Sequence, residues 1–152
     1  MQKIIGRKAE VAELKAIYES GRPELVVVYG RRRVGKTFLI REQFDGQFAF
    51  YHTGLSMQEI DTAKQKESQL QNFASSLRHD GMHNQKTLTD WLTAFDDLRS
   101  LLEEKMHDNP MQRQIVFLDE LPWMDTPRSN FLSALEHFWN GWGAGQTQLM
   151  LI

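Results

Sequence analysis

A glycine-rich pattern that directly follows an apolar run is the feature that most constrains this chain. Residues 25–29 read Leu-Val-Val-Val-Tyr, and residues 30–37 read Gly-Arg-Arg-Arg-Val-Gly-Lys-Thr. The apolar run is typical of a strand covered on both faces in a parallel sheet. The pattern after it has the spacing GxxxxGK followed by Ser or Thr, whose glycines permit a loop with backbone amides around phosphate oxygens. The sequence therefore predicts a phosphate-binding loop between a buried strand and a helix.

The residues of this loop suggest both a nucleotide and a metal ion as ligands. Lys36 can reach the β- and γ-phosphates as a mobile charge, and the Thr37 hydroxyl can ligate Mg²⁺. A helix that begins near Lys36 would add the positive end of its dipole. We therefore expect ATP and Mg²⁺ as ligands, with a nucleotide-binding set of Gly30, Arg31, Arg32, Arg33, Val34, Gly35, Lys36, Thr37 and Phe38.

Three consecutive arginines, Arg31 to Arg33, leave two interpretations open. They can steer ATP, contact a partner subunit or touch nucleic acid. Alternatively, they are solvated side chains beside a loop that binds through its backbone, which is the interpretation we favour. No residue of the sequence can be assigned as an arginine finger.

An acidic pair follows another apolar run. Residues 115–118 read Ile-Val-Phe-Leu, and Asp119 and Glu120 come next. Ligands of open α/β sheets bind at the carboxyl ends of the strands. Asp119 is therefore predicted to hold Mg²⁺ with its hydration shell, and Glu120 to polarise a water for in-line attack on the γ-phosphate. Taken alone, such a pair is more often a solvated part of a loop, and the glycine pattern is what favours a functional role.

Hydrophobic periodicity predicts alternating strands and helices. Strands are expected at residues 25–29, 48–51, 115–118 and 149–152. Helices are expected over residues 11–18 and 36–43, from a capping box at Ser56 and Glu59 to Gly81, from a second box at Thr87 and Asp90 to just before Pro110, and from Thr126 and Pro127 to Gly141. This order predicts an α/β domain, with Trp91, Trp139 and Trp142 in its core.

Composition sets the broad class of the chain. The 152 residues are 41% hydrophobic and 25% charged, which suits one globular domain. A net charge of -2 gives no overall basic field, so nucleic acid would need a local patch or a further module. The chain has no cysteine and no apolar stretch long enough for a membrane span, which favours the cytoplasm and no membrane contact.

The two motifs together resemble a known family. Residues 30–37, with Phe-Leu-Asp-Glu-Leu-Pro-Trp at residues 117–123, are similar to the archaeal-type ATPase family of the AAA+ and STAND P-loop NTPases. The resemblance extends to residues 5–10 and 131–139. It implies a three-layer, RecA-like α/β fold with a mainly parallel sheet, in which the last strand lies between the P-loop strand and the Asp119 strand. It also implies that Gly6 and Arg7 lie near the adenine, although position 8 is lysine where many relatives have an acidic residue.

The same resemblance implies that residues 1–152 form the N-terminal portion of a P-loop ATPase domain. The last expected strand stops at the final residue, and relatives continue with a sensor residue, a fifth strand, a helical lid and often a winged-helix or nuclease-like module. A fold incomplete at the C-terminus is therefore expected. Nucleic acid would be contacted through that further module.

Three functions are compatible with the sequence. The leading hypothesis is Mg²⁺-dependent ATP hydrolysis that drives a conformational or regulatory switch, with Lys36 and Glu120 as catalytic residues. The alternative is a nucleotide-gated interaction module that exchanges ATP and ADP with little hydrolysis. A small-molecule kinase ranks third, because the pair Asp119 and Glu120 is adjacent and no arginine-rich lid is evident. Self-association or a protein partner is compatible with all three.

Overall fold

Parallel strands form the centre of the molecule. The computed structural model describes residues 8–28, 35–56, 60–83 and 85–152, and within them four strands form one sheet in the order β1-β4-β3-β2. The strands are β1 (Glu24–Leu25), β2 (Phe48–Thr53), β3 (Gln114–Asp119) and β4 (Leu149–Leu151). This order confirms that the last strand lies between the P-loop strand and the strand that ends in Asp119.

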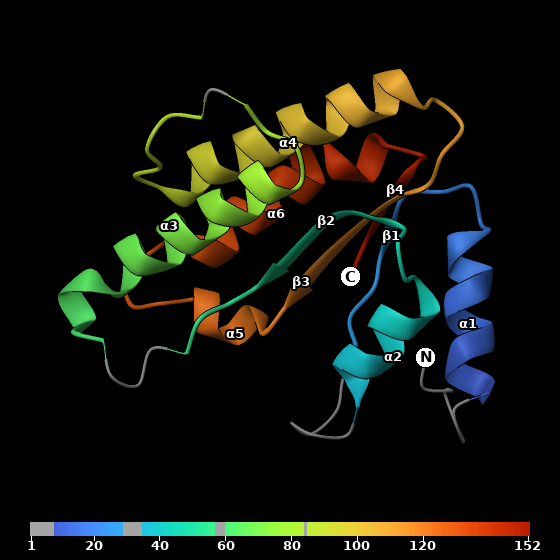
Figure 1. Ribbon diagram of the computed structural model, residues 1–152, viewed down its shortest axis with the longest axis horizontal. Coiled ribbons are helices and arrows are strands. Elements are labelled where there is room, and N and C mark those ends of the chain that lie inside the picture. Colours follow the sequence, from blue (N-terminus) through green and yellow to red (C-terminus); the bar gives the residue numbers. More distant parts are fainter. Residues whose placement is uncertain (1–7, 29–34, 57–59, 84) are drawn as a thin grey trace.

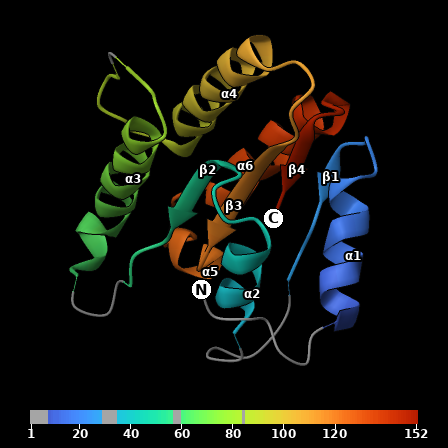
Figure 2. The same cartoon turned by 45° about the vertical axis from the view of Figure 1, so that its right-hand side comes forward.

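Helices lie on both faces of the sheet and complete three layers (Figures 1 and 2). One face carries α1 and α2, and the other carries α3, α4 and α6. The helices are α1 (Lys8–Tyr18), α2 (Lys36–Gln43), α3 (Thr62–His79), α4 (Trp91–Asp108), α5 (Leu121–Met124) and α6 (Phe131–Gly141), with a 3₁₀ turn η1 (Gly143–Gly145) before β4. No helix in the described part of the chain has the length and apolar character to cross a membrane.

The central strand β3 contributes to two hydrophobic cores. Val116 and Leu118 pack beneath α3, α4 and α6, whereas Ile115 and Phe117 pack beneath α1 and α2. This alternation follows from the two-residue period of a strand. Every residue of β3 is buried, so the strand that carries Asp119 is held from both sides.

The larger core is rich in aromatic rings. Trp91 contacts Phe73 and Phe131 edge to face, with ring centroids 5.3 Å and 4.8 Å apart. Trp142 is buried in the same core, and Trp139 packs against it while partly buried. The expected core position of these three tryptophans is thus confirmed.

The first strand differs from expectation in length and burial. Residues 25–29 were expected to form a strand covered on both faces, but β1 is assigned at Glu24–Leu25 only, and Tyr29 lies outside the described residues. One backbone hydrogen bond continues the pairing beyond Leu25, because the Val26 amide donates to Leu151 O at 2.7 Å. Leu151 is the last residue of β4, the strand that pairs with β1. Leu25 and Val27 are 50% and 61% exposed. Full burial was therefore a wrong prediction, because only the face that carries Val26 and Val28 is covered by α1 and α2.

Two helix starts that were expected from capping boxes are also wrong. The helix assigned to a capping box at Ser56 and Glu59 begins only at Thr62, and Glu59 lies outside the described residues. In α4 the N-cap is Asp90, whose carboxylate accepts the Thr93 amide at 2.7 Å. Asp90 thus provides the cap that Thr87 was expected to provide, since one side-chain acceptor is enough for the amide at the third helical position.

The segment before α6 is a turn instead of the first turn of a helix. Thr126 O accepts the Ser129 amide at 3.2 Å, and Arg128 has a positive φ of 59°. Proline at the second position and a left-handed third residue are typical of a type II turn. Pro127 therefore starts a turn, and α6 begins at Phe131, after Asn130. The short helix α5 was not expected from the sequence.

Candidate nucleotide site

The P-loop enters its helix through a left-handed glycine. Gly35 is the N-cap of α2, with φ 79° and ψ 20°, a conformation that a side chain would strain. Lys36 and Thr37 follow as the first helical residues, so both side chains project from the positive end of the helix dipole. The predicted helix over residues 36–43 is confirmed at both ends.

Thr37 and Asp119 meet at the carboxyl end of β3, although 82 positions separate them in the sequence. The Thr37 hydroxyl lies 3.0 Å from each carboxylate oxygen of Asp119. Asp119 is the last residue of β3 and is only 7% exposed. A hydroxyl and a carboxylate at one point are the oxygen donors that Mg²⁺ prefers, so these residues fit the expected ion.

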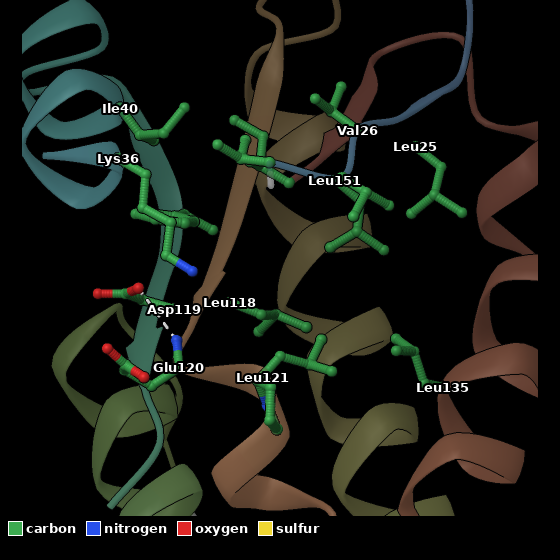
Figure 3. A pocket seen from close by; sticks show the side chains of 15 residues that line it. Leu25, Val26, Lys36, Ile40, Leu118, Asp119, Glu120, Leu121, Leu135 and Leu151 are labelled. Carbon is green, nitrogen blue, oxygen red and sulfur yellow. Dashed lines mark hydrogen bonds between the residues drawn. The ribbon is translucent and has the colours of Figure 1, made fainter. Parts of the chain in front are cut away.

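Glu120 leaves the strand in a strained conformation. Its φ of 55° and ψ of 42° place it in the left-handed region, which few residues other than glycine adopt. Its amide donates to Asp119 Oδ1 at 3.0 Å (Figure 3). The reversal of direction turns the chain into α5, and a strained residue at this edge of a sheet is a common property of functional sites.

A cleft of about 480 Å³ opens beside these residues, within the usual size range of ligand pockets. Lys36 points into it from α2, toward Asp119 and Glu120, as Figure 3 shows. The rest of the wall is mostly apolar and includes Leu118, Leu121, Leu135, Leu151 and the exposed Leu25. The cleft thus combines one charged wall with an apolar remainder.

Several predicted site residues lie outside the described residues. These are Gly6 and Arg7 and the first part of the P-loop, namely Gly30, Arg31, Arg32, Arg33 and Val34. Phe38 is described and half-buried in the first turn of α2, but it does not line the cleft. The structure therefore brings together Lys36, Thr37, Asp119 and Glu120 from the predicted set.

Tyr51 is a neighbour of the site that the sequence did not suggest. Burial raises the pKa of this phenol, and the negative charge of Asp119 raises it further. The ring packs edge to face on Phe117, and the Arg41 guanidinium lies 5.8 Å from its centroid. Tyr51 therefore stays protonated at neutral pH and forms a neutral wall beside the carboxylate.

Two further residues contact the backbone around Glu120, namely Gly54 and Gln69. The Gly54 amide donates to Asp119 O at 3.0 Å, and the Gln69 amide group donates to Trp123 O at 3.0 Å. Gly54 follows the end of β2 directly, at the same edge of the sheet as Asp119. That position was a usable signal in the sequence, whereas nothing in the helix around Gln69 distinguished it.

Sheet order and local geometry together define the class of this domain. A helix that starts at a glycine and carries lysine and threonine, opposite a carboxylate at the end of a parallel strand, is the arrangement of P-loop nucleotide-binding domains. The predicted three-layer α/β fold is thereby confirmed.

A family model described as an ATPase domain predominantly from Archaea matches residues 4–140. The match covers most of the 152 residues, and the chain belongs to this family. The family resemblance of the two motifs is therefore confirmed, and the chain is a nucleotide-binding domain of the ATPase type. No curated protein and no solved structure matches the chain.

Proposed function

We propose that the domain binds Mg·ATP in the cleft beside Lys36 and hydrolyses it, and that the reaction drives a conformational or regulatory switch. The observation that carries this proposal is the 3.0 Å approach of the Thr37 hydroxyl to the Asp119 carboxylate. It joins the end of the P-loop to the end of β3, as a site for a metal-bound triphosphate requires.

The triphosphate is bound by the start of α2 in this proposal. Lys36 neutralises the β- and γ-phosphates, and the backbone amides from Gly35 onward donate to phosphate oxygens at the helix N-terminus. The roles of Gly30 to Val34, and of Gly6 and Arg7 near the adenine, rest on the sequence pattern.

Thr37 and Asp119 are the residues that would hold Mg²⁺, directly or through its hydration shell. When bound, the ion supplies positive charge that offsets the charge developing on the phosphates. The chain's contribution is the placement of a hydroxyl and a carboxylate at one point. The Glu120 amide, which donates to Asp119 Oδ1, helps to fix that carboxylate.

Glu120 orients the attacking water in this proposal. A bond forms between the water oxygen and the γ-phosphorus while the bond to the β–γ bridging oxygen of ATP breaks, and Glu120 accepts the water proton. ADP and phosphate are the products. The strained backbone of Glu120 supports the assignment, because residues held in such conformations cluster at active sites.

We place this reaction in the cytoplasm and propose that a second copy or a protein partner regulates it. The absence of cysteine from the sequence supports a reducing compartment. Catalysis by this class depends on positioning and charge, so an arginine supplied by a partner would accelerate a slow basal reaction. The exchange module with little hydrolysis remains the competing hypothesis.

A binding titration with a turnover assay tests the proposal. A fluorescent ATP analogue is titrated with and without Mg²⁺ into the wild type, into Lys36→Ala and into Lys15→Ala, an exposed lysine on α1 that serves as the control. We expect Mg²⁺-dependent binding that only Lys36→Ala loses, with circular dichroism unchanged, and release of phosphate from ATP. Binding without phosphate release would favour the exchange module, and no binding by folded wild type would overturn the site.

A further inference from the structure

Gln69 is a fully buried amide in a helix face that is otherwise apolar. Its neighbours on α3, Leu70 and Phe73, belong to the larger core. A buried amide costs free energy unless its polar atoms are bonded, so a leucine would be the ordinary residue here. The partners of Gln69 show what this amide does.

All three bonds of Gln69 go to backbone atoms of two separate segments. Its Oε1 accepts the Leu55 amide at 3.2 Å, and its Nε2 donates to Leu55 O at 2.7 Å. The same Nε2 donates to Trp123 O at 3.0 Å. One side chain thus joins the exit of β2 to the last turn of α5, the segment that follows Glu120.

A second contact joins the same two segments on the other side of Glu120. The Gly54 amide donates to Asp119 O at 3.0 Å. A Cβ at Gly54 would lie 2.7 Å from Glu120 O and 3.1 Å from Met124 Cγ. Gly54 has no positive φ, so its backbone conformation does not require glycine. A residue without a Cβ is needed at position 54 because Glu120 O and Met124 approach so closely.

Glu120 therefore lies between two fixed points. Asp119 O is held before it and Trp123 O after it, and the Trp123 amide donates back to Glu120 O at 3.1 Å. We propose that Gln69 and Gly54 are positioning residues that hold Glu120 in its left-handed conformation and so orient its carboxylate toward the water that attacks ATP. This inference rests on the proposed ATP hydrolysis, and neither residue is assigned to touch the substrate.

The decisive variant is Gln69→Met, which keeps the length of the side chain and removes its three bonds. Its control is Gln71→Met, an exposed glutamine on the same helix. We expect kcat for ATP to fall about tenfold or more in Gln69→Met, with Kd for Mg·ATP changed less than about twofold. A purely structural role would lower stability without this split between kcat and Kd.

Amide hydrogen exchange gives a readout that does not need turnover. The backbone amides from Asp119 to Asp125 should exchange faster in Gln69→Met than in wild type. Their exchange rates should be unchanged in Gln71→Met. Unchanged exchange or an unchanged kcat in folded Gln69→Met would overturn the inference while leaving the proposed function intact. If wild type releases no phosphate, the proposed function fails by itself, and the exchange result still decides whether Gln69 holds this segment.

Gly54→Ala carries the test if Gln69→Met does not fold. The added methyl group meets Glu120 O, so we expect the same loss of kcat with retained ATP binding. Gly145→Ala is the matched control, because a Cβ at Gly145 meets nothing within 4 Å and its φ is not positive. Wild-type kcat in Gly54→Ala would overturn the inference.

Discussion

The Thr37 hydroxyl lies 3.0 Å from both carboxylate oxygens of Asp119, although the two residues belong to different crossover units of the sheet. One hydroxyl proton cannot bond fully to two acceptors at once. The proton is therefore shared between the two carboxylate oxygens, and the hydroxyl oxygen keeps lone pairs that can bind a hard cation while Thr37 stays neutral. This relationship leads to the first prediction.

Removal of the Thr37 hydroxyl should weaken the binding of Mg²⁺ at the site. We expect Thr37→Ala to raise the Mg²⁺ concentration for half-maximal phosphate release at least about tenfold, and Thr37→Ser, which keeps the hydroxyl, to raise it much less. Thr62→Ala, at an exposed threonine that begins α3, is the control. An identical Mg²⁺ titration for Thr37→Ala and wild type would exclude Thr37 as a ligand.

Glu120→Gln should separate binding from turnover. The amide keeps the size of the side chain but cannot accept the water proton, so we expect phosphate release to fall about 100-fold or more while Mg·ATP still binds. Glu136→Gln, at an exposed glutamate on α6, controls for the loss of one negative charge. Normal turnover by Glu120→Gln would contradict the assignment of Glu120 as the residue that activates water.

His52 should make the stability of the fold depend on pH. Burial lowers the pKa of His52 to about 4 from its ordinary value of 6.5, and its Nε2 has no hydrogen-bond partner among the described residues. The unfolded chain binds a proton near pH 6.5 and the folded chain only near pH 4. The free energy of unfolding should therefore fall as the pH is lowered between these values, by up to about 3 kcal/mol.

Chemical denaturation at a series of pH values measures this effect. In His52→Asn the fall in unfolding free energy between pH 6.5 and pH 4 should be much shallower than in wild type, whatever the stability at neutral pH. His79→Asn, at the exposed end of α3, should keep the wild-type slope. Equal slopes for wild type and His52→Asn would show that other groups cause the pH dependence.

Arg113 should be a stabilising residue far from the nucleotide. Its guanidinium is buried and donates to Thr147 O at 2.6 Å and to Ile17 O at 3.1 Å, joining the end of α1 to the approach to β4. Arg113→Met leaves both carbonyls without this donor, and we expect the free energy of unfolding to fall by about 2 kcal/mol. Arg22→Met removes an exposed ion pair at 3.6 Å and should change stability little, as urea denaturation would show.

Residues that lie far apart in the sequence could be assigned to one site where a motif restricts the residue types. Lys36 and Thr37 were predicted from the spacing of the glycine pattern and Asp119 from its place after an apolar run, because phosphate and metal binding restrict which residue types can follow a strand. The order of the sheet came from the resemblance and not from hydrophobic periodicity, since periodicity gives the strands without their neighbours. The expected strands at residues 48–51 and 115–118 were each found, slightly longer than expected.

The first residues of the helices and the roles of Gln69 and Gly54 were less predictable, for two physical reasons. Thr87 and Asp90 can both cap a helix by their residue types, and the sequence pattern does not distinguish Asp90, the residue that caps α4 directly before the buried Trp91. Gln69 and Gly54 gained their roles only through contacts with a segment that lies far along the chain. Neither residue belongs to a pattern that chemistry fixes in the sequence.

The two-sided burial of β3 has a consequence for how the domain can be altered. Asp119 ends a strand whose side chains alternate between two cores, so repacking of either core that shifts the strand would also move this carboxylate. A cavity-filling substitution on the α1 side would be transmitted to this carboxylate as readily as one beneath α4. Substitutions in one core that keep Asp119 in place therefore have to be compensated by substitutions in the other core, on the opposite face of the sheet.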